Sequence, residues 1–223
     1  MKMKILRQSL SNRIVHWVSA ISILMLIITG FGQMPLYGRY LVVQPPGTRW
    51  LTSYEITLYM HYIFAAVLLF IIFYHLAYHF LRKEFHILPK KGDLKASFEI
   101  IKAMILRRPE PASEKYLPEQ RLAYAYFAFA IAMVVITGIF KVIKNIQGVN
   151  VSNSLILWGA QLHNLATMLI ILGIIMHLAA FAFKANRKML SGMFTGYVNK
   201  EYVQERHSIW YHELEGQEEK KEN

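Results

Sequence analysis

The sequence predicts an all-α membrane protein: a bundle of four transmembrane helices with a short interfacial helix in its cytoplasmic loop. Three observations support this fold class. Of the 223 residues, 55% are hydrophobic and only 17% are charged, whereas soluble domains carry about 25% charged residues. Four apolar stretches are long enough to cross a bilayer. Lysine and arginine gather in alternate connecting segments, as expected for a chain that crosses a membrane repeatedly.

The composition also excludes several kinds of site. The chain has no cysteine, which excludes disulfides, thiolate zinc sites, cysteine-ligated iron–sulfur clusters and a cysteine nucleophile in this chain. The net charge of +11 would suit nucleic acid. However, the basic residues lie where membrane topology and anionic lipid headgroups account for them, so no nucleic-acid partner is expected.

The four spans follow from length and hydropathy. A spanning helix needs about 20 mostly apolar residues. The predicted spans are 14–34, 56–80, 122–140 and 155–183, and none contains Lys, Arg, Asp or Glu. The first apolar run is longer than that of a signal peptide and lacks a small-residue cleavage site, so it is predicted to be a span. The four spans together predict a transmembrane domain over residues 1–190 and a cytoplasmic tail over residues 191–223.

The basic residues predict the orientation of the chain. The N-terminal segment, the loop between the second and third spans and the C-terminal segment hold 21 of the 25 Lys and Arg residues. The other two loops, Tyr37–Tyr54 and Lys141–Asn153, hold the remaining four. Because basic residues favour the cytoplasmic side, both termini are expected in the cytoplasm of a bacterium or archaeon, with the spans in its inner membrane.

The long cytoplasmic loop contains a helical pattern. Within Lys95–Leu106, the apolar residues Phe98, Ile101, Ile105 and Leu106 share one side of a helix, which predicts a short helix lying at the membrane surface. The two prolines of 108–111 end this helix. The last eight residues, GQEEKKEN, predict a disordered end of the tail.

The histidines within the spans form two levels. His61 and His75 lie on the second span, and His163 and His177 lie on the fourth. A separation of 14 residues is about four helical turns, so each pair shares one helix face, and its members are about 21 Å apart along the helix. His16 opens the first span on the cytoplasmic side. This pattern predicts one set of ligands near each membrane surface.

The ligand types favour haem over a bare metal ion. One imidazole from each of two facing helices suits a haem, because the porphyrin supplies four more nitrogens to the iron. Zinc or copper would need three or four protein ligands at one point. A C-x-x-C-H motif is absent, so the bundle is predicted to enclose two noncovalent b-type haems. Small residues would let the flat macrocycle approach the backbone: Gly30, Gly32, Ala65, Ala66, Gly138, Gly159, Ala160 and Gly173.

The histidines and the small residues can also be explained by helix packing alone. A single histidine in a span also fits a hydrogen-bonded packing residue, and small residues are ordinary at helix contacts. The Ile-Thr-Gly motifs at 28–30 and 136–138 are interpreted as helix packing. The matched spacing on two helices is what favours ligation.

Depth assigns only one of the two ligand pairs. The outer level holds His61 and His163, which therefore form the predicted outer pair. The inner level holds three candidates for two places, namely His16, His75 and His177. His79, one turn beyond His75, is expected at headgroup level beside a haem propionate.

A series of short, different motifs runs along the whole chain. They are Arg-Ile-Val-His-Trp at 13–17, His61, Leu-Pro-Lys-Lys at 88–91 with Asp93, Arg-Pro-Glu-Pro at 108–111, Lys-Tyr at 115–116, Gln-Arg-Leu-Ala-Tyr at 120–124, Thr-Gly at 137–138, His163, His177, Met-Phe-Thr-Gly at 193–196 and Trp-Tyr at 210–211. In this order and spacing the chain resembles the diheme cytochrome b family of the formate dehydrogenase gamma subunit type. Relatives of that family include the b subunits of nickel–iron hydrogenases and thiosulfate reductases.

The resemblance implies a complete set of iron ligands and a quinone site. It pairs His16 with His177 for the inner haem and His61 with His163 for the outer haem. His75 then becomes an extra residue that contacts a propionate or the quinone, or an alternative inner ligand. The quinone site is implied near the loop before the third span, where Gln120 matches the family. Leu117 stands where the formate dehydrogenase type usually has Asn.

The resemblance also implies a role in anaerobic respiration. The chain would be the membrane anchor of a respiratory complex, passing electrons from a periplasmic-side iron–sulfur subunit to menaquinone or ubiquinone at the cytoplasmic side. Substrate oxidation would belong to a partner catalytic subunit containing molybdenum, tungsten or nickel–iron. A higher oligomer of the complex would fit the family.

Three alternatives remain open from the sequence. The chain could serve a membrane hydrogenase, or a thiosulfate or polysulfide reductase with electrons running from quinol. It could be a stand-alone diheme quinone oxidoreductase supplied by a diffusing donor. It could also be a haem-free four-span scaffold or transporter whose histidines act as polar packing residues.

Overall fold

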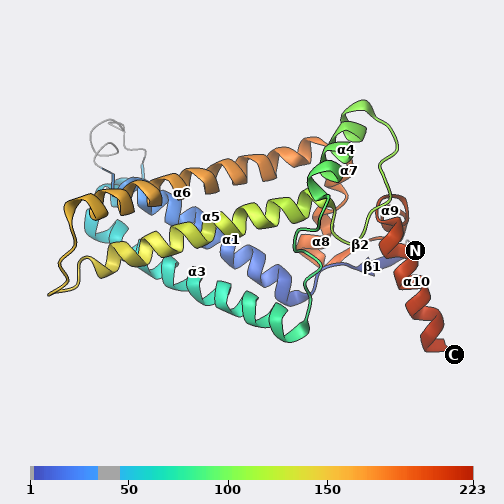
Figure 1. Cartoon of the computed structure of the whole chain (residues 1–223), viewed down its shortest axis with the longest axis horizontal. Coiled ribbons are helices and arrows are strands. Elements are labelled where there is room, and N and C mark those ends of the chain that lie inside the picture. The colour runs from blue at the N-terminus through green and yellow to red at the C-terminus, as the bar shows by residue number, and fades with distance from the viewer. Residues whose placement is uncertain (1–2, 35–45, 223) are drawn as a thin grey trace. The chain divides into compact units, whose positions relative to one another are not determined.

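The computed structural model describes residues 3–34 and 46–222 and is mostly helical (Figure 1). Its four long helices are α1 (Leu10–Gly32), α3 (Tyr54–Arg82), α5 (Pro118–Ile143) and α6 (Asn153–Ala179). All four are long and apolar enough to cross a membrane, which confirms the four predicted spans to within a few residues. Part of the predicted loop Tyr37–Tyr54, residues 37–45, lies outside the described residues.

Shorter elements make up the rest of the described chain. They are β1 (Lys4–Leu6), η1 (Arg49–Thr52), α4 (Asp93–Leu106), η2 (Ala180–Ala182), α7 (Lys184–Arg187), α8 (Leu190–Thr195), β2 (Tyr197–Asn199), α9 (Lys200–Arg206) and α10 (Ser208–Glu222). Helix α4 confirms that the loop between the second and third spans contains a short helix. The expected disordered end is wrong, because α10 continues through GQEEKKE to Glu222.

Serine and proline residues set where the long helices begin. The Ser9 and Ser152 hydroxyls accept hydrogen bonds from the backbone N–H groups of Asn12 and Leu155, at 3.2 and 3.4 Å. The Ser53 hydroxyl caps α3 in the same way. These bonds satisfy N–H groups that have no partner inside the helix. Helix α5 instead begins with Pro118, whose missing N–H costs nothing in the first turn.

The chain divides into two compact units. One unit is Ser9–Lys83, in which α1 and α3 pack as an antiparallel hairpin (Figure 1). The other unit combines Met1–Gln8 with Glu84–Asn223 and contains a second hairpin, α5 with α6. Each hairpin therefore belongs to its own unit.

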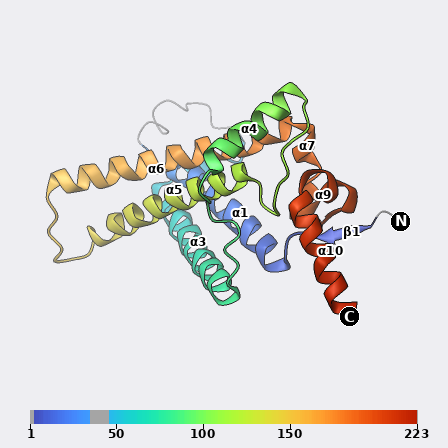
Figure 2. The ribbon, with the colours of Figure 1, turned by 45° about the vertical axis from the view of Figure 1, so that its right-hand side comes forward.

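The end of the chain folds together with its beginning in the second unit (Figure 2). Strands β1 and β2 pair antiparallel, with Ile5 opposite Val198. A small apolar core lies beside them, formed by Val198, Tyr202, Val203, Trp210 and Tyr211. The tail is therefore a packed structure.

Candidate haem-ligand sites

In the first unit, the imidazole of His61 is tied to helix α1. The Thr29 hydroxyl lies 2.9 Å from His61 Nδ1, and it also lies 2.7 Å from the backbone carbonyl of Met25. Thr29 is fully buried. Gly30 lies beside the ring, since a Cβ built on it would lie 3.5 Å from His61 Cε1, at ordinary contact distance.

In the second unit, the imidazole of His163 has the same surroundings. The Thr137 hydroxyl lies 2.9 Å from His163 Nδ1 and 2.7 Å from the carbonyl of Met133. A Cβ on Gly138 would lie 3.4 Å from His163 Cε1. The two Ile-Thr-Gly motifs thus contact histidine rings, and their interpretation as helix packing alone is wrong.

The two hairpins repeat one another in sequence position as well as in these contacts. His61 and His163 are 102 residues apart, and so are His75 and His177, whereas Thr29 and Thr137 are 108 apart. In that numbering His16 of the first hairpin corresponds to Tyr124 of the second. His79 likewise corresponds to Phe181, so the first hairpin carries two imidazoles, those of His16 and His79, that the second lacks.

The candidate residues of the inner level lie among aromatic rings. The His16 ring meets Trp17 edge to face at 5.0 Å between centroids, and the His75 ring meets His79 at 4.5 Å. His177 lies between Phe127 and Phe181, at 6.4 and 5.9 Å. His16, His61 and His75 belong to the unit Ser9–Lys83, whereas His163 and His177 belong to the other. The pairings of these residues across the two units stay predictions.

The glycines of the spans serve two different purposes. A Cβ on Gly32 would come within 2.8 Å of the Leu51 carbonyl oxygen, and one on Gly173 within 2.8 Å of the Tyr126 ring. Phe140 fills the space beside Gly159 in the same way. These three glycines give room to neighbouring protein atoms, and room for a macrocycle beside them stays a prediction. For Gly30 and Gly138 the histidine rings are the neighbours.

The donor set fits b-type haem. Among residues 3–34 and 46–222, no three side chains of the types His, Asp or Glu converge as a bare ion would require. Single imidazoles on apolar helices, with Nδ1 hydrogen-bonded and Nε2 on the other side of the ring, match histidine ligands of haem iron. His61 and His163 show this arrangement most fully.

Gln120, predicted to lie at a quinone site, takes part in a hydrogen-bonded cluster. Its amide oxygen accepts hydrogen bonds from Arg7 Nη2 and from the backbone N–H of Leu117, both at 3.1 Å. Its amide nitrogen lies 3.2 Å from the Met189 sulfur. The Gln120 amide thus joins Arg7, the start of α5 and Met189, and a quinone contact through it stays a prediction.

Arg7 and His207 form the buried centre of this cluster, which the sequence did not reveal. Arg7 donates from Nη1 to His207 Nε2 at 3.0 Å and from Nη2 to the carbonyl of Lys115 at 2.8 Å. His207 Nδ1 lies 2.7 Å from the carbonyl of Glu114. Burial, with Arg7 second, lowers the pKa of His207 to about 3. Residues separated by 200 positions meet here, so no local pattern could indicate the contact.

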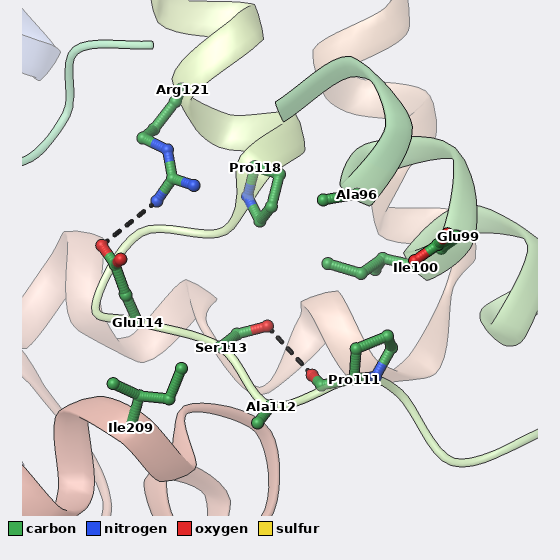
Figure 3. Close-up of a pocket in the computed structure, with 10 residues that line it drawn as sticks. All are labelled: Ala96, Glu99, Ile100, Pro111, Ala112, Ser113, Glu114, Pro118, Arg121 and Ile209. Atoms are coloured by element: carbon green, nitrogen blue, oxygen red, sulfur yellow. Dashed lines mark hydrogen bonds and ion pairs between the residues drawn. The ribbon is translucent and has the colours of Figure 1, made fainter. Parts of the chain in front are cut away.

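A pocket lies between α4, the loop before α5 and Ile209 at the start of α10 (Figure 3). Arg121 points toward it and toward Glu114. Its Nε and Nη2 bind the two carboxylate oxygens of Asp93 at 2.8 and 2.6 Å, and its Nη1 binds the carbonyl of Tyr116 at 2.7 Å. The hydrogen bonds from Arg121 lower the pKa of Asp93. Arg121 therefore fixes α4 and the loop to α5.

Comparison with known proteins identifies the family of the chain. No curated protein matches the chain. The family described as prokaryotic cytochrome b561 matches residues 7–196, which covers all four long helices. That family implies a multi-pass membrane cytochrome b that binds b-type haem and takes part in electron transfer. Because the family match covers most of the chain, including its four apolar helices, the chain belongs to the prokaryotic cytochrome b561 family.

Proposed function

We propose that this chain is the membrane-anchor cytochrome b subunit of a respiratory oxidoreductase complex of the formate dehydrogenase type. Electrons would enter from an iron–sulfur subunit at the outer membrane face and leave to menaquinone or ubiquinone at the cytoplasmic face. The observation that carries the proposal is the repeated hairpin, in which each second helix bears two histidines 14 residues apart. Two such helices provide ligands at both membrane surfaces.

Four histidines would hold the two haems. We assign His61 with His163 to the outer haem and His16 with His177 to the inner haem, with His75 as the alternative inner ligand. Bound haem supplies reversible one-electron transfer. The chain's own contribution is to hold each imidazole in one orientation, to surround it with apolar helices and to keep water from it. Quinone reduction takes up protons, which the cytoplasmic side would supply.

The haem assignment is tested by counting haem in purified variants. We expect two b haems per chain in the wild type and one in His163→Ala, measured as pyridine haemochrome and by redox-titrated absorption spectra. His212→Ala is the matched control, because this histidine is exposed on α10. If mature wild-type protein shows no Soret band, the haem assignment is wrong and the haem-free scaffold is the better explanation.

The role in the complex is tested in native membranes. Disrupting the gene should abolish formate-dependent reduction of quinone, and formate should reduce the b haems in the intact strain. Hydrogen and thiosulfate, or quinol with polysulfide, are the comparison substrates. Activity with one of these and not with formate would assign the chain to a hydrogenase or a sulfur reductase. The metal of the co-purified catalytic subunit, molybdenum or tungsten against nickel, gives an independent readout.

We also propose that α4 lies in the membrane interface. Its buried side, with Ile100 only 2% exposed, faces α5. Leu94, Phe98 and Ile105 are strongly exposed along another side, where they follow a helical repeat. Lys95, Lys102 and Glu99 lie on the adjoining flank, also exposed. An apolar stripe with a charged flank suits the boundary between headgroups and acyl chains.

The absence of cysteine makes this placement easy to test. Single variants Phe98→Cys and Glu99→Cys, each labelled with a polarity-sensitive fluorophore in lipid nanodiscs, compare the two sides of α4. We expect the label at position 98 to report an apolar environment that lipid-soluble quenchers reach, and the label at 99 to report water. Equal aqueous signals at both positions would contradict the interfacial placement.

A further inference from the structure

The threonines of the two hairpins act on the histidines in the same way. In each unit the first helix brings a threonine hydroxyl to 2.9 Å from Nδ1 of the histidine on the second helix: Thr29 to His61 and Thr137 to His163. The same contact occurs twice in one chain, each time with a glycine beside the ring, Gly30 or Gly138. A repeated polar contact inside an apolar hairpin indicates a shared purpose.

The hydrogen-bond donors and acceptors around each ring determine which nitrogen of the imidazole carries the proton. A hydroxyl has one proton to donate. Thr29 lies 2.7 Å from the carbonyl of Met25, and Thr137 lies 2.7 Å from that of Met133. Because a carbonyl oxygen only accepts, the hydroxyl proton points to it, and the hydroxyl oxygen accepts from the ring. His61 and His163 therefore carry their proton on Nδ1, and Nε2 keeps its lone pair.

Burial makes this choice of tautomer a strong one. Thr29 is 0% exposed and Thr137 is 7% exposed, so water does not compete for the hydroxyls. The opposite tautomer would place two acceptors, Nδ1 and the threonine oxygen, against each other with the hydroxyl proton already used. A buried contact of that kind costs about 1–3 kcal/mol.

We infer that Thr29 and Thr137 are positioning residues that hold His61 and His163 in the iron-binding tautomer and set the properties of the outer haem. This inference rests on the proposed function, because it takes both histidines as haem ligands. An imidazole that donates from Nδ1 is a more basic ligand, and a more basic ligand favours ferric over ferrous iron. Loss of either hydroxyl should therefore raise the outer haem's reduction potential and weaken its binding.

The experiment compares threonine variants of the full chain in detergent or nanodiscs. Thr29→Val and Thr137→Val remove the hydroxyl and keep the shape, whereas Thr137→Ser keeps the hydroxyl. Thr167→Val is the matched control, because this hydroxyl donates to the backbone carbonyl of His163 at 2.9 Å, whereas the contact at the ring Nδ1 is made by Thr137. The readouts are the midpoint potential of each haem and the rate of haem transfer to excess apomyoglobin.

We expect each valine variant to lose the outer haem about 10–100-fold faster and to shift one of the two potentials upward. The inner potential, Thr137→Ser and Thr167→Val should stay at wild-type values. Unchanged potentials and unchanged haem loss in both valine variants would overturn the inference while leaving two haems in place. Absence of haem from the wild type would instead overturn the proposed function. If a valine variant does not accumulate, alanine at the same position removes the same acceptor and replaces it in the test.

Discussion

At the scale of single residues, hydrogen-bond partners decide how the histidines of this chain behave. His207 follows the same logic as His61 and His163. Its Nδ1 donates to the carbonyl of Glu114, and its Nε2 accepts from Arg7. The side chain is 0% exposed. A proton added at Nε2 would lose the bond from Arg7 and place two cations together, so His207 is neutral at pH 7.

His207 should make the tail sensitive to acid. Its pKa is lowered to about 3 in the folded chain, by burial first and then by Arg7, against about 6.5 when unfolded. Between these values the unfolded state binds more protons. The stability is therefore complete above about pH 6.5 and falls as the pH drops toward 3. Amide hydrogen exchange of β1 and β2, corrected for intrinsic rates, should speed up from pH 7 to pH 4.5 and do so much less in His207→Gln. An identical pH response in the variant would exclude His207 as the cause.

Sequence periodicity predicted the histidines that we propose as ligands but missed the threonines that contact them. The spacing of 14 places His61 and His75, or His163 and His177, on one face without any knowledge of tertiary structure. The contact of Thr29 with His61 instead depends on how two helices are aligned along each other, which no single-helix pattern contains. The available signal was the repeated Ile-Thr-Gly motif.

At the scale of elements, close helix contacts use glycine where a neighbouring group needs the space. Gly32 ends α1 against the Leu51 carbonyl and the Thr57 methyl group. Gly173 of α6 lies against Tyr126 and Phe127 of α5. The sequence showed small residues in the spans but not what lies opposite them, which is why haem and helix packing were equally good explanations.

A pair of glycine substitutions separates packing from helix propensity. Gly32→Ala places a methyl group 2.8 Å from a backbone oxygen, and we expect a loss of about 1–3 kcal/mol from the strain. Gly216→Ala is the control, since nothing lies within 4 Å of its added Cβ in α10, and it should gain up to about 1 kcal/mol from helix propensity. Thermal stability in detergent, followed by size-exclusion chromatography, measures both. A neutral Gly32→Ala would mean that α1 and α3 separate there without cost.

At the scale of the whole molecule, hydropathy determined the spans and long-range contacts determined the rest. The four spans were predictable because a bilayer demands about 20 apolar residues in one helix. The tail was not, because its short helices are stabilised by partners such as β1, whose Ile5 pairs with Val198. The family match ends at residue 196, so the apolar core formed by Val198, Tyr202, Val203, Trp210 and Tyr211 lies beyond it.

The inner haem is where the repeat and the family resemblance give different answers. The repeat matches His75 with His177, as it matches His61 with His163, whereas the resemblance pairs His177 with His16. We expect the resemblance to hold, so that His16→Ala loses the inner haem and His75→Ala keeps two haems with a changed inner potential. Haem counts and redox titrations of both variants distinguish the answers, with His177→Ala as the reference for complete loss. Loss of a haem in His75→Ala alone would assign both haems to α3 and α6, leaving His16 to another role at the start of α1.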